Sequence, residues 1–600
     1  MQCQSTLLPI FNFLCYHYDV EICIGGTIAM DTMSQIAALA AECIKNLWPD
    51  AEGLPGAEDL RGLLAVPPDP ALGDYAFPCF RLAKPLRMAP PKIAEALCGA
   101  WTREDVASVK PVNGYMNFFL NRANFAAETM AALQAQGDRF GSSDIGKGKT
   151  ICLDYSSINI AKRFHIGHLS TTMIGHSLKR IFDFLGYETV GINHLGDWGT
   201  QFGKMICAYK LWGSKEEVER DGVDAMTRLY VRFHEEAEKD PSLEDQGRAW
   251  FKKIEDGDPE AMEIFTWFKE VTLRDAAKVY EQLGVTFDSY AGESFYNDKM
   301  EPVIQELRDK HLLTQSEGAW VVDLSEDNMP PCLILKSDGA TIYATRDITA
   351  AIYRQNTYHF DKCLYVVAYQ QDLHFRQVFR VLEKMGYPWA KDCVHVSFGM
   401  VSLEGAALKT RTGNVVLLED LLDQAVAKAR EIIEEKSPNL ENKEEVARQV
   451  GIGAVVYADL SNNRIKDIDF RWDRALNFDG ESGPYVQYTH ARACSVLRKA
   501  GDVSAEPDWS ALTDDEAQSL LRLLSRFPDV IREAADKYEP SMVTRAVTDI
   551  AQAFNKYYYE HRILDGEPAQ AAARIALTDA VRRVIKTGLY LIGVEAPEKM

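Results

Sequence analysis

Two histidines three residues apart are the strongest chemical signal in the chain. The sequence His165-Ile166-Gly167-His168 follows an apolar run at residues 150–155 and opens a helix predicted over residues 168–185. The N-terminus of a helix attracts anions through its backbone N–H groups and its dipole, and imidazole N–H groups add further donors. We therefore interpret the motif as a phosphate-binding turn between a strand and a helix. The alternative is that the two histidines only cap the helix.

A turn of this kind needs a sheet behind it, and the surrounding sequence predicts one. Strands are predicted at residues 150–155, 189–195, 341–344, 362–368 and 394–401, alternating with helices. The run at 362–368 contains neither proline nor glycine, as expected for a buried parallel strand. This alternation predicts an α/β fold with a doubly wound parallel sheet. An acidic insertion near residues 215–269 is predicted to be helical and solvated.

The regions on either side of the sheet have different patterns. Residues 34–148 predict a small α+β module with a helix from Ser34 to Pro49, a second helix at 92–97 and a strand at 115–120. Beyond residue 417 the chain is predicted to be almost entirely helical, with helices at 444–461, 514–533, 541–562 and 568–591. We expect residues 1–33 to be a disordered or wrongly annotated start, with Met30 or Met33 as alternative initiators. The expected domains are 1–33, 34–148, 149–417 and 418–600.

The composition narrows the class of protein and its compartment. The chain has 600 residues, of which 46% are hydrophobic and 26% charged, and its mean hydropathy is −0.21. These values are typical of globular proteins, and no apolar run reaches the roughly 18 residues of a membrane span. The 12 cysteines never form a C-x-x-C pair, so we expect buried thiols in the reducing cytoplasm, no structural metal and no membrane partner. Taken alone, the net charge of −22 disfavours a nucleic-acid partner.

Several further motifs accompany the histidine pair. They are DYSSINIAK at 154–162, NHLGDWGTQFG at 193–203, GES at 292–294, YATRD at 343–347, QQDLH at 370–374, KTRTGN at 409–414 and GPYVQY at 483–488. Together they resemble the class I arginyl-tRNA synthetases over about residues 34–600. The resemblance implies a Rossmann-like catalytic domain at 149–417, preceded by a module that contacts the tRNA elbow. It also implies that 418–600 holds a stem-contact segment and a helical anticodon-binding domain.

The activity implied by this resemblance is a two-step ligation. Arginine would react with ATP, supplied with Mg²⁺, to give arginyl-adenylate, and the arginyl group would then pass to the terminal adenosine of arginine tRNA. The expected partners are arginine, ATP and arginine tRNA, and a monomer is expected. Two alternatives are a catalytically weakened tRNA-binding homologue and a smaller H-x-G-H nucleotidyltransferase. The second would need neither the helical C-terminal region nor two carboxylates for a guanidinium.

The resemblance also assigns the nucleotide-binding residues. His165, Gly167 and His168 would contact ATP, and the loop with Lys409 and Arg411 corresponds to the second ATP motif of class I enzymes. Lys162, His165, His168 and Lys409 would be catalytic. Lys162 would replace the second lysine of that loop, which many arginine enzymes lack.

Binding of the amino acid places different demands on the protein. A guanidinium is a planar fork of five donors, which carboxylates bind in a bidentate manner. The residues that match the family's pocket for the arginine side chain are Glu293, Tyr343, Asp347 and Gln371. Asn159 and His194 would hold the α-amino or carboxylate end. For tRNA we expect stacking on Tyr557, Tyr558 and Tyr559 and a contact at Met600.

Two residues depart from the family's pattern. Ser170 follows H-x-G-H-L where the family usually has arginine, and Ile158 stands where proline is usual. The lost cation would weaken ATP binding unless Arg163 compensates for it.

Overall fold

The structure is a computed structural model that describes residues 32–404 and 416–600. The chain divides into two compact units, Met1–Asn121 and Arg122–Met600. The first unit thus ends before the turn residues near Gly148, where the sequence places the end of the first module, and the domain limits remain predictions. Within the described ranges, none of the helices has both the length and the apolar character needed to cross a membrane.

The first unit contains an antiparallel sheet in the order β1–β3–β2. Its strands are β1 (Tyr75–Pro78), β2 (Ala107–Val112) and β3 (Tyr115–Leu120), and its helices are α1 (Thr32–Leu47), α2 (Ala57–Leu63), α3 (Ala83–Leu86) and α4 (Pro90–Ala100). Gly73 precedes β1 with a φ of +101°, and a Cβ there would lie 2.6 Å from the Phe118 carbonyl oxygen. Only glycine permits this approach. The strand predicted at 115–120 and both predicted helices are confirmed.

The second unit is built on a parallel sheet in the order β10–β9–β4–β5. The strands are β4 (Thr150–Asp154), β5 (Glu188–Ile192), β9 (Lys362–Tyr365) and β10 (Cys393–His395). Helix α6 (Leu169–Phe184) connects β4 to β5 and buries Ile174, Leu178 and Ile181. Helix α5 (Arg122–Gln136) precedes the sheet. The predicted parallel sheet is confirmed, because β4 pairs in parallel with both β5 and β9.

Two strand predictions were wrong. Residues 341–344 open helix α13 (Tyr343–Tyr358), and of these residues Thr341 forms an isolated bridge with Leu335. A short apolar run cannot be assigned to a strand or a helix by periodicity alone. Residues 394–401 are divided between β10 and β11 (Val401–Leu403), which pairs in another sheet with β12 (Ile468–Phe470). Gly399 marks the division, because a Cβ there would lie 2.3 Å from the Lys466 carbonyl oxygen.

Two insertions interrupt the parallel sheet. The first is helical, as predicted for 215–269, and contains α7 (Thr200–Trp212), α8 (Lys215–Asp221), α9 (Val223–Lys239), α10 (Ser242–Glu255) and α11 (Pro259–Leu283). The second comprises α12 (Met300–Asp309) and an antiparallel sheet of β6 (Leu313–Ser316), β7 (Ala319–Val322) and β8 (Cys332–Leu335). The sequence did not predict this sheet. Helix α14 (Asp372–Lys384) follows β9.

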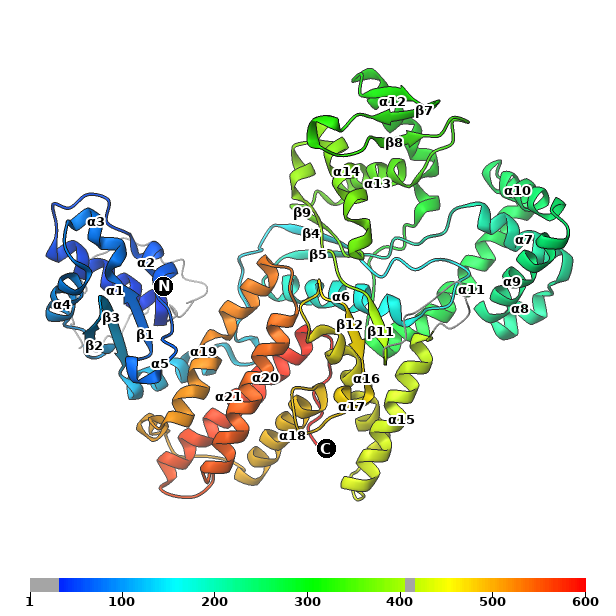
Figure 1. The fold of residues 1–600 in the computed structure, drawn as a ribbon. Helices are drawn as coiled ribbons and strands as arrows, with labels where there is room; N and C mark the ends of the chain where they lie inside the picture. The colour runs from blue at the N-terminus through cyan, green and yellow to red at the C-terminus, as the bar shows by residue number, and fades with distance from the viewer. Residues whose placement is uncertain (1–31, 405–415) are drawn as a thin grey trace, which may run out of the picture. The chain divides into compact units, whose positions relative to one another are not determined.

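The C-terminal part is helical, as predicted. Its helices are α15 (Leu418–Lys436), α16 (Lys443–Leu460), α17 (Trp472–Ala475), α18 (Gly483–Ala500), α19 (Asp515–Asp536), α20 (Ser541–Glu560) and α21 (Pro568–Leu591). Helices α15 and α16 lie side by side, and α19, α20 and α21 form a bundle (Figure 1). The four helices predicted in this region correspond to α16, α19, α20 and α21.

Candidate active site

The histidine motif forms the turn between β4 and α6. His165 precedes a 3₁₀ turn at Ile166–His168, and its Nδ1 accepts a hydrogen bond of 3.1 Å from the Gly167 backbone N–H. This acceptor role assigns the His165 proton to Nε2. Nδ1 of His168 lies 3.2 Å from the His165 backbone nitrogen and 3.3 Å from its carbonyl oxygen, so it can accept from one or donate to the other. The two rings are 4.0 Å apart between centroids.

Both imidazoles are neutral at neutral pH. Burial lowers the pKa of His165 and lowers that of His168 to about 3, and the Lys162 ammonium acts in the same direction on both. The turn therefore offers N–H dipoles rather than positive charges. Gly167 keeps the turn tight, because a Cβ at this position would lie 2.8 Å from Cε1 of His165.

Two cationic residues directly before this turn have different surroundings. Lys162 is exposed. The Arg163 guanidinium binds the Asp224 carboxylate of α9 at 2.6 Å, and compensation by Arg163 stays a prediction. Lys409 and Arg411 lie outside the described residues.

The carboxylates predicted to bind a guanidinium share one environment. Asp347 and Tyr343 lie one turn apart on α13, as their spacing predicts. Burial raises the pKa of Glu293 to about 7, and the nearby Asp347 and Asp197 carboxylates raise it further, while Arg346 opposes them. Tyr343 is 66% exposed, and partial burial together with the nearby Glu293 charge raises the pKa of its hydroxyl. Burial is therefore the main reason why Glu293 resists ionisation, and an arriving cation would favour its ionised form.

The remaining predicted residues lie on nearby loops. Asn159 forms an isolated bridge with Gly196, and a Cβ at Gly196 would lie 2.3 Å from Oδ1 of Asn159. The Leu195 carbonyl, one residue before Gly196, accepts from the Glu293 backbone N–H at 2.9 Å. His194 is half-buried beside them. Gln371 is exposed at the start of α14.

Several residues of this site were not singled out from the sequence. His374 lies 2.5 Å from Oδ2 of Asp347 through its Nε2. Asp197 is fully buried and binds Lys269 at 2.7 Å and the Ser294 backbone N–H at 2.8 Å. His374, Asp197 and Ser294 fall within motifs that carry the resemblance, which is the signal that would have found them. Lys269 lies on α11 in the insertion, outside every motif.

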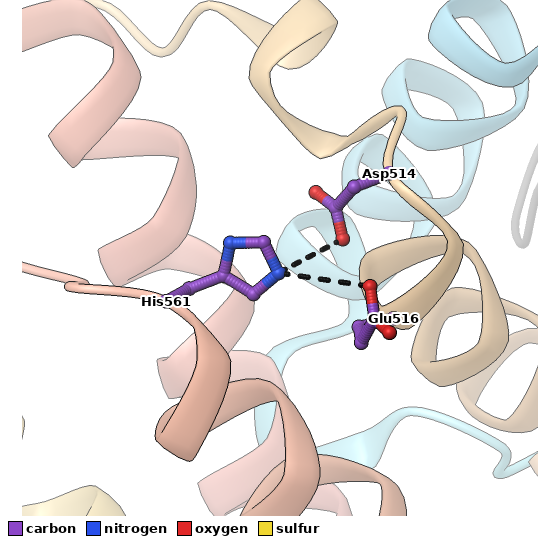
Figure 2. A group of neighbouring side chains, drawn as sticks. All are labelled: Asp514, Glu516 and His561. Atoms are coloured by element: carbon purple, nitrogen blue, oxygen red, sulfur yellow. Dashed lines mark ion pairs between the residues drawn. The ribbon is translucent and has the colours of Figure 1, made fainter.

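The prediction that three consecutive tyrosines stack on bases was wrong for Tyr557. Its side chain is fully buried, and its ring stacks on His561 at 4.6 Å. Nε2 of His561 lies 3.2 Å from Asp514 and 3.9 Å from Glu516 (Figure 2). Because neighbouring residues on a helix point to different faces, Tyr558 and Tyr559 are 40% and 87% exposed.

The two carboxylates near His561 also have partners of their own. Asp514 accepts from the Ala517 backbone N–H and so caps α19, and Glu516 pairs with Lys556 at 3.3 Å. Met600 is partly buried against the apolar cluster of α15 and α16.

Ser170 faces the protein interior. It is 2% exposed, and its hydroxyl donates to Oδ1 of Asp459 in α16 at 2.6 Å. A residue at this position therefore contacts α16, and its identity does not determine how many cations face the phosphate-binding turn.

Comparison with known families agrees with this geometry. The family model "tRNA synthetases class I (R), catalytic domain" matches residues 129–472, and "DALR anticodon binding domain" matches 486–600. The "Arginyl tRNA synthetase N terminal domain" matches residues 34–120. The parallel sheet with its histidine turn is thus the catalytic domain of a class I aminoacyl-tRNA synthetase.

Whole-chain relatives narrow the class further. The chain is 55% identical over 557 residues to the arginine–tRNA ligase of Alkaliphilus metalliredigens, covering 92% of this chain and 98% of that protein. It is 50% identical over 570 residues to the arginine–tRNA ligase of Clostridioides difficile, covering 95% of this chain and 100% of that protein. The arginyl-tRNA synthetase structure from Thermus thermophilus matches with a TM-score of 0.78 and 26% identity. The match covers 94% of this chain and 99% of that one. The chain belongs to the arginyl-tRNA synthetase family.

The buried Asp459 makes the stability of the protein depend on pH. Burial raises the pKa of Asp459 to about 7 from 3.8, although the Ser170 hydrogen bond opposes this. The folded state therefore prefers the neutral acid, and the protein loses stability as the pH rises from about 4, where the unfolded chain ionises, to about 7, where the folded carboxyl ionises. We expect Asp459→Asn to raise the melting temperature relative to the parent more at pH 8 than at pH 5. An equal change in melting temperature at both pH values would contradict the raised pKa of Asp459.

Proposed function

We propose that the chain ligates arginine to its tRNA in two steps. The arginine carboxylate attacks the α-phosphorus of ATP, and pyrophosphate leaves. A ribose hydroxyl of the terminal adenosine of the tRNA then attacks the arginyl carbonyl, and AMP leaves as the hydroxyl proton is lost. ATP enters as its Mg²⁺ complex, so the metal belongs to the substrate. The observation that carries the proposal is a turn of histidines with lowered pKa values that follows β4, in a segment whose Ile160 binds Gly196, next to the Leu195 carbonyl that accepts from Glu293.

The two parts of the site have separate roles in this proposal. Nε2–H of His165 donates to a phosphate oxygen of ATP, and His168 and Gly167 complete the turn around the nucleotide. Lys162 supplies the positive charge that stabilises the crowded α-phosphate in the transition state. Lys409 and Arg411 contribute from the second ATP loop. The family membership and the low pKa of both imidazoles support this division of roles.

Selection of the amino acid rests on the carboxylates. Glu293 and Asp347 bind the guanidinium, with Tyr343 and Gln371 around it. Asn159 and His194 hold the α-amino and carboxylate end of arginine. The buried Glu293 carboxyl supports this assignment, because a cation that binds beside it favours its ionised form.

Contact with tRNA is proposed for the C-terminal helices. Tyr558 and Tyr559 are exposed enough to stack on unpaired bases, and Tyr557 no longer belongs to this set. Among the described residues, nothing favours the alternative of a catalytically weakened homologue, because Ser170 contacts Asp459.

ATP–pyrophosphate exchange tests the function directly. We expect exchange that depends on arginine and on no other standard amino acid, measured with and without arginine tRNA. Exchange with a different amino acid would contradict the proposal. Binding of tRNA without exchange under either condition would favour the weakened homologue.

The raised pKa of Glu293 predicts how the reaction depends on pH. Glu293 must be ionised to bind a guanidinium, so protonation below pH 7 should lower kcat/KM for arginine by up to about tenfold per pH unit. Glu293→Gln should have a low kcat/KM that no longer falls in this range. Tyr343→Phe, which keeps the carboxylate, should retain the pH dependence. A parent profile that is flat between pH 6 and 8 would show that Glu293 is not involved.

Asp347→Asn tests the choice of arginine over citrulline. A neutral ureido group leaves the pocket carboxylates without partners, which costs about 1 to 3 kcal/mol or more. The variant should raise the KM for arginine at least about tenfold, equivalent to 1.4 kcal/mol. It should also narrow the preference for arginine over citrulline. The KM for ATP should be unchanged. The control is Asp338→Asn, an exposed aspartate that accepts from the Ala340 backbone N–H. Loss of ATP affinity instead would place Asp347 in the nucleotide site.

A further inference from the structure

A buried arginine lies on the same helix as two of the proposed arginine-binding residues. Arg354 of α13 is 1% exposed, and its Nη2 donates to Oδ2 of Asp154 at 2.7 Å, at the end of β4. The guanidinium also lies over the Tyr365 ring, 5.3 Å from its centroid. Asp154 is 5% exposed, so the ion pair is almost entirely removed from water.

Stability alone does not explain this ion pair. Removing two charges from water costs free energy that their attraction often fails to recover, and apolar replacements are frequently as stable. Nε and Nη1 of Arg354 have no partner in good hydrogen-bond geometry among the described residues, although the guanidinium also interacts with the Tyr296 hydroxyl and the Cys363 thiol. Such poorly paired buried donors are uncommon in proteins.

The hydrogen bond of Arg354 to His194 suggests a role beyond stability. Nη2 lies 3.4 Å from Nδ1 of His194. A guanidinium has donors and no acceptor, so Nδ1 of His194 has to accept. The ring proton of neutral His194 then sits on Nε2. Among the described residues no group bonds to Nε2, and the ring is only half-buried, so this N–H can reach a ligand.

The position of Arg354 on α13 connects it to the rest of the pocket. Arg354 follows Asp347 by seven residues and Tyr343 by eleven, so the three share one face of the helix. Oδ1 of Asp154 accepts from the Ser157 hydroxyl at 2.8 Å. Ser157 has a φ of +45°, in the left-handed region, and precedes Asn159 by two residues. Asp154 therefore orients the turn before Asn159 and, through Arg354, the His194 ring.

We propose that Arg354 is a positioning residue that holds His194 as the Nε2–H tautomer, so that His194 binds the carboxylate of the amino-acid substrate. A donor at Nε2 suits a carboxylate oxygen and does not suit the α-ammonium group, which is itself a donor. The α-ammonium is left to Asn159, whose side-chain oxygen can accept. This inference rests on the proposed function.

The tautomer can be measured without any variant. In ¹⁵N NMR of the parent protein, His194 should show an unprotonated Nδ1 and a protonated Nε2 at pH 8, with the signal assigned from its loss in His194→Gln. A protonated Nδ1 in the parent would overturn the proposal. This result does not depend on catalytic activity.

The second test uses Arg354→Lys. The ammonium can still pair with Asp154, but it lacks the planar fork that reaches both partners. We expect a mixture of His194 tautomers and a KM for arginine raised about tenfold, the loss expected for a hydrogen bond to a charged group. Agmatine, which has the guanidinium and ammonium of arginine but no carboxylate, should inhibit parent and variant with the same constant.

The matched control is Tyr365→Phe. It keeps the ring beneath Arg354 and removes a buried hydroxyl that interacts with the Cys363 thiol rather than with His194 or Asp154. It should leave the KM for arginine, the agmatine constant and the tautomer unchanged. Equal losses of arginine and agmatine binding in Arg354→Lys would mean a structural role and overturn the inference. A parent protein without arginine-dependent exchange would instead contradict the proposed function.

Discussion

The backbone of the loop after β5 holds the candidate site together. Gly196 donates to the Ile158 carbonyl at 2.9 Å and accepts from Ile160 at 3.2 Å, so it is tied to the turn after β4 from both sides. The Leu195 carbonyl, one residue earlier, accepts a hydrogen bond from the Glu293 backbone N–H. The Asp197 carboxylate, one residue later, accepts from the Ser294 backbone N–H. Because parallel strands end at the same edge of the sheet, segments distant in sequence meet at this loop. Glycine at 196 is required, since a side chain there would collide with Asn159.

The two parts of the candidate site would bind ligands of opposite charge. In the proposed function the histidine turn holds a polyanion, yet burial and Lys162 lower the pKa of both imidazoles, so the rings would contribute oriented N–H dipoles while Lys162 carries the charge. In the proposed guanidinium pocket, burial raises the pKa of Glu293, and the Asp347 and Asp197 carboxylates add to this rise. A bound cation would lower that pKa again, so binding of the ligand and ionisation of Glu293 are coupled. This coupling favours a permanent cation such as guanidinium over a neutral isostere.

The sequence predicted the parts of the fold that have strong local patterns. The helices α16, α19, α20 and α21 and the strands β4, β5 and β9 carry clear periodicity, and each is where it was expected. The second insertion was missed: its strands β6, β7 and β8 have four residues each, and β6 has no buried position, so it lacks the apolar pattern that marks β9. In the candidate site, the sequence singled out residues only within motifs, and it missed Arg354, which lies outside them. Its importance comes from contacts with Asp154 and His194, which are 200 and 160 residues away in sequence, and no local pattern reports such contacts.

Net charge is a poor guide to how this chain would hold a nucleic acid. The chain carries a charge of −22, yet its C-terminal helices combine a cation with aromatic faces. The Arg492 guanidinium lies 4.9 Å from the Tyr488 ring and 5.1 Å from the Tyr558 ring, and each ring is 40% exposed. A guanidinium stacked between rings keeps its charge while its conformational freedom is already restricted. An exposed ring beside a fixed cation is the combination that binds unpaired nucleotides. Local placement of a few side chains, rather than the overall balance of acids and bases, therefore decides whether such a surface can accept a polyanion.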